Sequence, residues 1–516
     1  MNRAALLRTA SDPAVEWDVV IIGGGATGLG TAVEAATRGH CVVLLERGDF
    51  AQGTSSRSTK LIHGGLRYLR QGNLRLVADS LAERGRLLRN APHLVRPLKF
   101  VLPTSGWCET AFYAAGLKLY DHLSRDYSLG VSRILNSRET LALAPTLAPD
   151  HVRGGIAYVD AQFDDARLAL ALAQTAADWG AIPLNHVAVT ALVKSHGRVC
   201  GVTARDVETG HVFELRAKVV INAAGVFGDA VRRLDEPAAS PKLAPSQGAH
   251  LVLPRRFLPG DTAVIIPRTA DGRVLFAIPW HGCVLLGTTD TPVTETDAEP
   301  RPFAAEVDFL LAHAAGHFTP APTASDILSV FAGLRPLVKA DQTTARLPRD
   351  HALLVSSSGL VSISGGKWTT YRKMGEDTVN TAERVANLPP RPSRTATLPL
   401  HGAGAAANAT AADSCYGIDA PAMADLLRVH PEWDRPLHPR MAVRPLEIIW
   451  AARHEMARTV EDVLSRRTRM LILDARASME IAPHVAALLA RELGRDEQWA
   501  REQVTAFCGL ARGYLP

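Results

Sequence analysis

Four residues near the start of the chain have the spacing that a dinucleotide-binding site requires. Residues 23–28 read Gly-Gly-Gly-Ala-Thr-Gly, and Glu46 follows 18 positions after the last of these glycines. In such a turn Gly23 permits the tight bend, Gly25 lets the backbone approach a pyrophosphate, and Gly28 allows close helix–strand packing. The helix that follows adds its dipole and unpaired N–H groups, and the Glu46 carboxylate can accept hydrogen bonds from a ribose diol. The pattern predicts dinucleotide binding with FAD and NAD both open, against the alternative of a glycine-rich loop in another kind of α/β protein.

The elements around this turn form a predicted βαβ unit. An apolar, β-branched run at 18–22 predicts a buried parallel strand, an alanine-rich helical pattern leads to a stop at Gly39, and 41–45 predicts the next strand. An amphipathic helix is expected at 164–179. Strands joined by helical crossovers, followed by strands with hairpin-like spacing, predict an α/β plus α+β fold in which a Rossmann-like domain is interleaved with an antiparallel-sheet domain. The further strands are expected at 187–193, 199–206, 219–222, 249–252, 274–278 and 284–287.

Composition along the chain suggests the domain boundaries. Residues 388–412 are rich in proline, glycine and alanine, which is typical of a linker or a long surface loop. Beyond it, helix-spaced apolar residues at 446–469 and 482–493 predict a small all-α domain, and Thr459 to Asp462 has the Ser/Thr-x-x-acid start signal. The expected parts are an N-terminal extension at 1–16, a Rossmann-like domain interleaved with a substrate domain at 17–387 (substrate parts near 70–160 and 241–330), the linker at 388–412, and the helical domain at 413–516.

The overall composition excludes several classes of protein. With 47% hydrophobic and 21% charged residues, the 516-residue chain is neither disordered nor a coiled coil. A net charge of +5 is too dilute for nucleic acid as a partner, but it suits an acidic small molecule or an anionic membrane surface. The six cysteines contain no C-x-x-C pair, which opposes a disulfide framework and a structural zinc site, and no metal is expected. No apolar run of about 18 residues and no signal-peptide core occur. We therefore expect a cytoplasmic protein, either soluble or peripheral on the cytoplasmic membrane face.

A hydroxyl-rich segment at 54–68, TSSRSTKLIHGGLRY, suits a loop laid along a cofactor, although alone it would be a polar surface loop. Together with the glycine turn and Glu46, it closely resembles the FAD-dependent glycerol-3-phosphate dehydrogenase family of the D-amino-acid-oxidase-like flavoproteins. The most specific segments are 61–68 and 365–372, and the resemblance covers most of the chain. It continues at 120–123, 164–168, 221–225, 287–290, 333–337, 348–350 and 459–468.

This resemblance implies a non-covalent FAD cofactor and oxidation of sn-glycerol 3-phosphate at C2 to dihydroxyacetone phosphate, with a hydride passing to flavin N5 and electrons to a membrane quinone. Lys367 and the backbone amides of the helix start that follows it would stabilise negative charge at the N1–C2=O edge of the flavin; the alternative is simple capping of that helix by threonines. The expected cofactor-binding residues are Gly23, Gly25, Thr27, Gly28, Glu46, Arg47, Thr54, Ser55, Ser58, Lys60, Leu61, Gly64, Gly65, Val187, Gly225, Gly366, Lys367, Trp368 and Thr369.

The same motifs imply a substrate site. A phosphate dianion is best bound by the planar, permanently charged guanidinium group, and the arginines in matching motifs are Arg67, Arg335 and Arg349, with Tyr68 beside the first. Removal of the hydroxyl proton suits a histidine, because its pKa lies near neutrality. His250 is the expected base, with His63 in reserve, and Arg335 would stabilise the developing alkoxide. Which arginine binds phosphate stays open.

Residues 107–123 form a candidate membrane-facing helix. Phe112, Gly116, Leu119 and Leu123 fall on one helical face, widened by Tyr113, Leu117 and Tyr120, and Lys118 and Arg125 would meet anionic headgroups. An amphipathic helix packed on its own domain is an equal alternative. A homodimer is also left open.

Four rival functions remain. A glycerol-3-phosphate oxidase would use oxygen and typically carries an insertion for which this spacing leaves little room. An amine or amino-acid oxidase of the same fold would bind a carboxylate with one arginine. An RNA-binding flavoprotein would require basic clusters interleaved with aromatics, which make up only 6% of the chain. An inactive scaffold would be expected to lose Arg67, Arg335 and Lys367, which are present.

Overall fold

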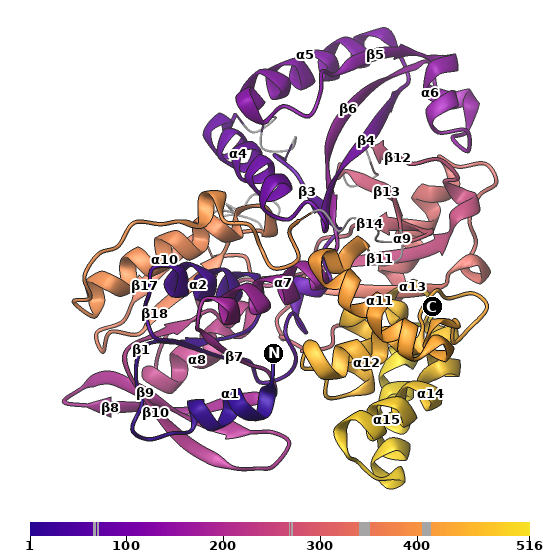
Figure 1. Ribbon diagram of the computed structural model, residues 1–516. Coiled ribbons are helices and arrows are strands. Elements are labelled where there is room, and N and C mark those ends of the chain that lie inside the picture. Colours follow the sequence, from indigo (N-terminus) through magenta and orange to yellow (C-terminus); the bar gives the residue numbers. More distant parts are fainter. Residues whose placement is uncertain (66–68, 70–71, 268, 270–271, 340–350, 405–413) are drawn as a thin grey trace.

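The computed structural model describes the whole chain except residues 66–68, 70–71, 268, 270–271, 340–350 and 405–413. In the view of Figure 1, one β-sheet lies at the lower left and the other at the upper right, and the C-terminal helices, drawn in orange and yellow, lie at the lower right. Among the helices of the described residues, none combines the length and the apolar composition that a membrane-spanning segment requires.

The first sheet has eight strands and contains the predicted βαβ unit. Its order is β17-β18-β10-β1-β2-β7, with β9 on β10 and β8 on β9, and β18, β10, β1, β2 and β7 are parallel neighbours. The prediction of buried parallel strands is confirmed, because β1 is almost wholly buried from residue 19 onward. Helix α2 (Ala26–Thr37) packs against α7 (Asp165–Asp178) and α10 (Tyr371–Val385). The strands are β1 (Glu16–Ile22), β2 (Val42–Leu45), β7 (Ile182–Leu184), β8 (Val187–Ser195), β9 (Arg198–Asp206), β10 (Val212–Asn222), β17 (His351–Val355) and β18 (Val361–Gly365).

The second sheet has ten strands, most of them antiparallel. Its order is β15-β11-β14-β13-β12-β4-β6-β3, with β16 on β11 and β5 on β6. It uses two stretches of chain, from β3 to β6 and from β11 to β16, so the interleaved α/β plus α+β fold class is confirmed. Helices α4 (Leu74–Asn90), α5 (Trp107–Ser124), α6 (Ser137–Leu143) and α9 (Ala304–Ala315) flank it. The strands are β3 (Leu61–Ile62), β4 (Val95–Thr104), β5 (Arg133–Asn136), β6 (Gly154–Phe163), β11 (Ser246–Pro254), β12 (Thr262–Ile266), β13 (Leu275–Trp280), β14 (Cys283–Gly287), β15 (Thr291–Pro292) and β16 (Ser329–Arg335).

The C-terminal part is helical throughout its described residues. The predicted pattern at 446–469 divides into two segments, because α12 (Pro445–His454) ends before a new start at Thr459, where Thr459 Oγ1 accepts a hydrogen bond from the Asp462 N–H at 3.0 Å. A π-helical turn (Asp462–Arg467) follows. The other α-helices of its described residues are α11 (Ala420–Val429), α13 (Met470–Leu473), α14 (Ala475–Leu493) and α15 (Glu497–Ala511), which is followed by the short turn η13 (Arg512–Tyr514).

The predicted N-terminal extension and the predicted linker both pack on the body of the protein. The predicted extension at 1–16 contains α1 (Arg3–Ala10), where Arg3 donates to Asp206 at 2.6 Å. The predicted linker packs closely up to residue 404: Leu400 is buried, and the side-chain amide of Asn90 donates to the Thr395 carbonyl at 3.2 Å.

Candidate active site

The glycine turn between β1 and α2 has no room for side chains. Gly23 has φ +112°, a conformation that favours glycine, and a Cβ there would lie 2.7 Å from the Ala223 carbonyl oxygen. A Cβ on Gly28 would lie 1.9 Å from the Gly23 carbonyl oxygen. The close approach of the turn to β10 and of α2 to the turn therefore depends on these two glycines.

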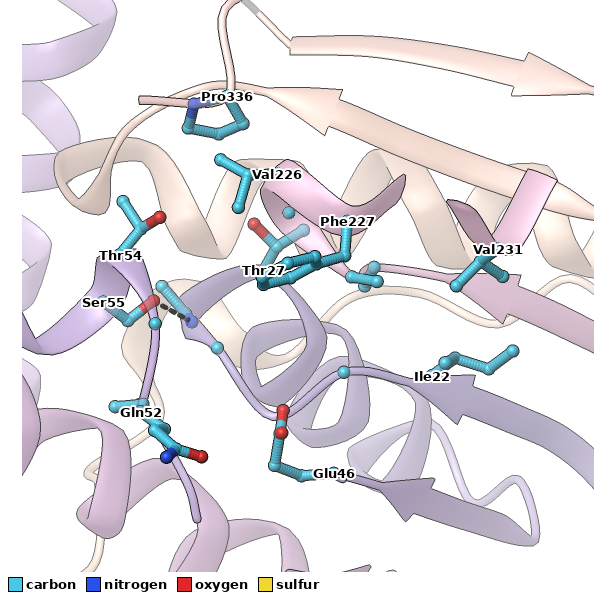
Figure 2. Close-up of a pocket in the computed structure, with 18 of the residues that line it drawn as sticks. Ile22, Thr27, Glu46, Gln52, Thr54, Ser55, Val226, Phe227, Val231 and Pro336 are labelled. Atoms are coloured by element: carbon cyan, nitrogen blue, oxygen red, sulfur yellow. Dashed lines mark hydrogen bonds between the residues drawn. The ribbon is translucent and has the colours of Figure 1, made fainter. Parts of the chain in front are cut away.

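A cavity of about 360 Å³ opens beside this turn. Figure 2 shows Glu46 below the turn at the end of β2, Phe227 and Val226 on the opposite wall, and Thr54 and Ser55 at one end. A Cβ on Gly225 would meet nothing within 4 Å, so this part of the wall is open. The predicted cofactor residues that line the cavity are Gly23, Gly25, Thr27, Glu46, Arg47, Thr54, Ser55, Gly225, Gly366, Lys367 and Trp368.

Glu46 both lines this cavity and holds the turn. Its carboxylate accepts hydrogen bonds from the N–H groups of Gly24 at 2.7 Å and Gly48 at 2.9 Å. Burial raises the pKa of this carboxyl. Arg47 stacks its guanidinium over the Phe227 ring at 4.0 Å, so it forms part of the wall opposite the glycine turn.

Hydrogen bonds of Ser55 and Trp368 join three segments that line the first cavity. The Ser55 hydroxyl accepts a hydrogen bond from the Ala26 N–H at 2.9 Å, at the start of α2 (Figure 2). The Ser55 carbonyl accepts one from the indole of Trp368 at 2.9 Å. The beginning of α2, the hydroxyl-rich segment and the 365–372 motif are therefore joined at one place.

A second cavity of about 190 Å³ adjoins the first and shares part of its lining. The shared residues are Thr54, Pro336, Gly365, Gly366, Lys367 and Trp368. The second cavity is also lined by the predicted catalytic residues His250 and Arg335, by the reserve histidine His63, and by Ser58, Leu61 and Thr369 from the predicted cofactor set.

Strand pairing explains why His250 and Arg335 share this cavity. In β11 and β16, His250 lies opposite Phe331, Gly248 opposite Gly333, and Ser246 opposite Arg335. Alternate residues of a strand share a face, so His250 and Arg335 lie on one face with the glycine pair between them. These glycines leave space where side chains would otherwise fill the cavity.

His250 is buried, and its surroundings favour the neutral form of the imidazole. Its Nε2 is hydrogen-bonded to the Thr59 hydroxyl at 3.0 Å, and its ring stacks on Phe331 with centroids 4.7 Å apart. Burial, followed by the charges of Lys60 and Arg335, holds the pKa of His250 well below its ordinary value. Its Nδ1 has no hydrogen-bond partner within the described part of the chain. Such an imidazole can accept a proton.

Arg335 is held firmly at the rim of this cavity. Its guanidinium pairs with Asp290 at 3.2 Å and donates to the Thr289 carbonyl at 2.9 Å and the Thr288 hydroxyl at 3.1 Å. Its side chain is 20% exposed. A Cβ on Gly248 would lie 2.3 Å from Nη2, so glycine is needed for the arginine to cross this strand.

Several predicted residues lie away from both cavity linings. Lys60 is fully buried, with its ammonium 2.6 Å from Asp165 Oδ2, so its charge is directed into the protein. Gly64 packs against Tyr120, whose hydroxyl accepts from the Gly64 N–H at 2.8 Å. Gly28, Gly65 and Val187 belong to neither lining, whereas Val189 of the same strand as Val187 lines the first cavity. Arg67, Tyr68 and Arg349 lie outside the described residues.

Arg57 and Thr59 are among the residues that line the second cavity without having been predicted as site residues. Both lie inside the segment 54–68 that carries the resemblance, and that position could have indicated a role at the site. Phe227, in the wall of the first cavity, gave no such signal, because nothing in its local sequence pattern indicates contact with Arg47.

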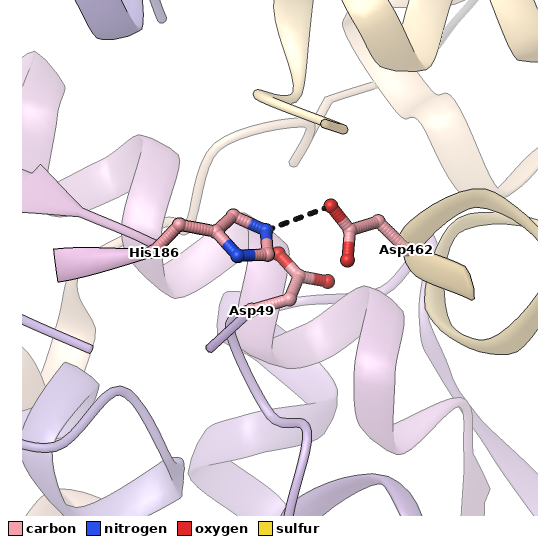
Figure 3. A group of neighbouring side chains, drawn as sticks. All are labelled: Asp49, His186 and Asp462. Carbon is pink, nitrogen blue, oxygen red and sulfur yellow. Dashed lines mark hydrogen bonds and ion pairs between the residues drawn. The ribbon is translucent and has the colours of Figure 1, made fainter. Parts of the chain in front are cut away.

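One group of metal-ligating side chains meets within the described residues. Asp49, His186 and Asp462 place ligand atoms within 4.8 Å of one another (Figure 3), and His186 Nε2 lies 2.9 Å from Asp462. Arg466 and Arg467 also bond to Asp49, at 2.5 and 2.9 Å for their Nε and Nη2 atoms. These cations already neutralise the carboxylates, so the group is an ion-pair cluster between the first sheet's domain and the C-terminal helices.

Comparisons with known proteins agree over the full length. Residues 18–372 match the FAD dependent oxidoreductase family, and residues 393–500 match the C-terminal domain of alpha-glycerophosphate oxidase. The mitochondrial glycerol-3-phosphate dehydrogenase of Rattus norvegicus is 38% identical, over 99% of this chain and 76% of the relative.

Solved structures show the same architecture. A glycerol-3-phosphate dehydrogenase from Bacillus halodurans, complexed with FAD, matches with a TM-score of 0.81 and 30% identity over 100% of this chain and 98% of the other. Glycine oxidase from Geobacillus kaustophilus matches with a TM-score of 0.54 and 22% identity, over 74% of this chain and 98% of the other, a likeness that concerns the fold alone.

Proposed function

Because this chain belongs to the FAD-dependent glycerol-3-phosphate dehydrogenase family, we propose that it oxidises sn-glycerol 3-phosphate at C2 and passes the electrons to a membrane quinone. It is a flavoenzyme that uses FAD, and glycerol 3-phosphate oxidation is its activity. The observation that carries the residue assignments is the second cavity, where His250, Arg335 and Lys367 meet beside the cavity of the glycine turn.

The residues of the first cavity fit FAD. The side-chain-free turn at Gly23 and Gly28 leaves backbone amides at the start of α2 for a pyrophosphate, and Glu46 is placed for a ribose. Gly366, Lys367 and Trp368 line both cavities, so they are assigned to the flavin end. When bound, the flavin supplies the hydride acceptor for oxidation of the secondary alcohol.

His250 is assigned as the base that takes the proton from the C2 hydroxyl. Its neutral imidazole lies in the cavity wall, held by the Thr59 hydroxyl and the Phe331 ring. Arg335 lies on the same sheet face, where its guanidinium stabilises negative charge that develops on the substrate oxygen. Phosphate binding is assigned to Arg67, Tyr68 and Arg349, together with Arg335, on the resemblance of their motifs.

Anaerobic mixing of the yellow protein with sn-glycerol 3-phosphate tests the activity directly. We expect prompt bleaching of the flavin by this substrate and none by glycine or proline, which probe the amino-acid oxidase alternative. Persistent colour with an intact cofactor would contradict the proposal. The acceptor is tested next: reduced enzyme is expected to reoxidise with a soluble quinone much faster than with dissolved oxygen, and rapid oxygen uptake would favour the glycerol-3-phosphate oxidase alternative.

Peripheral attachment to a membrane is proposed for the surface of α5 and β5. Trp107, Phe112 and Leu119 of α5 are 76%, 61% and 40% exposed. Val131, just before β5, and Ile134, within it, are 74% and 50% exposed, and β5 contacts α5. The opposite face of α5 packs on its own domain, with Leu117 and Tyr120 buried. Figure 1 places α5 and β5 at the end of the molecule far from the first sheet. Exposed tryptophan and phenylalanine on such a helix are typical of interfacial binding.

Replacement of Trp107 and Phe112 together by serine is expected to reduce cosedimentation with phosphatidylglycerol-containing vesicles by about tenfold, since two large apolar side chains lose burial in lipid. Flavin reduction by substrate should be unchanged. Val429→Ser, which alters a 71% exposed side chain of the helical domain, is the control. Unchanged vesicle binding by the double variant, or equal loss in the control, would contradict this surface assignment.

A further inference from the structure

The segment 54–60, named here the active-site loop, borders both cavities on one side. Thr54 lines both cavities, Ser55 lines the first, and Arg57, Ser58 and Thr59 line the second. The other side of the loop is held by buried charges. Lys60 has φ +62°, a left-handed conformation that a side-chain-bearing residue adopts only where its surroundings hold it.

Asp165, at the start of α7, is the centre of this support. Its fully buried carboxylate accepts hydrogen bonds from the N–H and hydroxyl of Ser58, at 3.0 and 2.7 Å, and from the Lys60 ammonium at 2.6 Å. The Lys60 ammonium also donates to the Ser56 carbonyl at 2.7 Å. The buried ion pair of Asp165 and Lys60 thus holds the backbone of the active-site loop at residues 56 and 58.

The C-terminal domain completes this support through Arg469. One guanidinium nitrogen, Nη2, donates to Asp165 Oδ1 at 2.8 Å and to the same Ser56 carbonyl at 2.8 Å, across 304 and 413 positions of sequence. The side chain is only 2% exposed. A buried carboxylate shared by two cations has a strongly determined geometry, because any displacement leaves charge unpaired away from water.

The C-terminal domain also supports Arg57, the loop residue after Ser56, through Glu299. The Tyr514 hydroxyl donates to Glu299 Oε1 at 2.6 Å, and Glu299 Oε2 accepts from the Arg57 guanidinium at 2.5 Å. On the cavity side, the Thr59 hydroxyl is hydrogen-bonded to His250 Nε2 at 3.0 Å. The path from Arg469 to the base therefore runs through Asp165 and the loop backbone to Thr59.

We infer that Arg469 is a positioning residue for the reaction: by holding the active-site loop through Asp165 and Ser56, it places the Thr59 hydroxyl that orients His250. This gives the C-terminal helical domain a role in catalysis without a contact to the substrate. The inference rests on the proposed function, because it takes His250 as the base.

The test is a double-mutant cycle on the holoenzyme, with anaerobic flavin reduction by sn-glycerol 3-phosphate and the KM for this substrate as measurements. Thr59→Val removes the hydroxyl with little change of shape, and Arg469→Gln removes the charge of the support. Each is expected to slow reduction about 10- to 100-fold, since small misplacements of catalytic groups have effects of this size. KM and FAD content should stay close to wild type. The double variant should be no slower than the slower single variant, because both changes act through one path.

Two further variants separate positioning from stability. Thr59→Ser keeps a hydroxyl and should restore most of the rate. Arg444→Gln alters another buried arginine of the helical domain, which pairs with Glu447 and Asp434 of the same domain. It should lower the Tm but leave the reduction rate unchanged. Should Arg469→Gln fail to fold, Arg469→Lys replaces it; lysine keeps the charge but not the guanidinium geometry, so a smaller slowing of reduction is expected.

The inference is overturned if Thr59→Val reduces at the wild-type rate, if the two effects multiply in the double variant, or if Arg444→Gln slows reduction as much as Arg469→Gln. A wild-type protein that is not bleached by the substrate would refute the proposed function instead, so the two failures are distinguishable.

Discussion

Flavin reduction by sn-glycerol 3-phosphate should slow by about 10²- to 10⁴-fold when His250 is replaced by asparagine, the usual contribution of a positioned base. Asparagine retains polar atoms that can reach the Thr59 hydroxyl but cannot take up a proton at neutral pH. The bound FAD should be unaffected, because His250 lines the second cavity and not the first. Stopped-flow absorbance under anaerobic conditions measures the effect.

The pH dependence of the wild-type enzyme tests the same residue independently. Burial, with the Lys60 and Arg335 charges, lowers the pKa of His250, so the neutral, proton-accepting form persists at pH values below the ordinary histidine value of about 6.5. As pH falls, kcat/KM should therefore hold until the pH is below that value and only then decline. His484→Asn, an exposed change on α14, is the control. A wild-type rate in His250→Asn would transfer the role to the reserve candidate His63.

Loss of bound flavin is the expected result of Gly28→Ala. The added methyl carbon would lie 1.9 Å from the Gly23 carbonyl oxygen, a backbone atom that cannot move without opening the turn. Overpacking of this kind costs about 1–3 kcal/mol or more, and here the displaced backbone is the part that would face the pyrophosphate. The variant should purify largely colourless, measured as the ratio of flavin to protein absorbance, with a lowered Tm.

Gly509→Ala is the matched control for this variant. Gly509 lies in α15, and a Cβ there meets nothing within 4 Å, so alanine should raise helix stability by up to about 1 kcal/mol and leave the flavin content unchanged. If Gly28→Ala retained a full complement of FAD, the pyrophosphate assignment of the glycine turn would be wrong.

Local pattern was sufficient for β1, β2, β8, β9 and the end of β10 in the first sheet, but it missed β7, β17 and β18 and parts of the second sheet. The apolar run before the glycine turn, the turn itself and α7 were predictable, because strand alternation, glycine conformation and helix capping depend on neighbours in the chain. Strands β4 and β6 were not predicted. β4 contains Pro97 and Pro103 and β6 begins with Gly154 and Gly155, residues that weaken a strand signal, and their stability comes from pairing with each other.

The residues of the site, like the strands, divide into those that local sequence predicts and those that it does not. The family, the glycine turn and the residue types for flavin and phosphate chemistry were predictable from the sequence, since contiguous motifs carry them. Which of those residues face the cavities depends on the folded arrangement of the chain. It directs Lys60, expected at the cofactor, toward Asp165, and it brings Thr59 to His250 across 191 positions and Arg469 to Ser56 across 413. The physical reason is that a buried charge or polar atom takes its position from the partner that compensates its lost hydration, and that partner lies in another part of the chain.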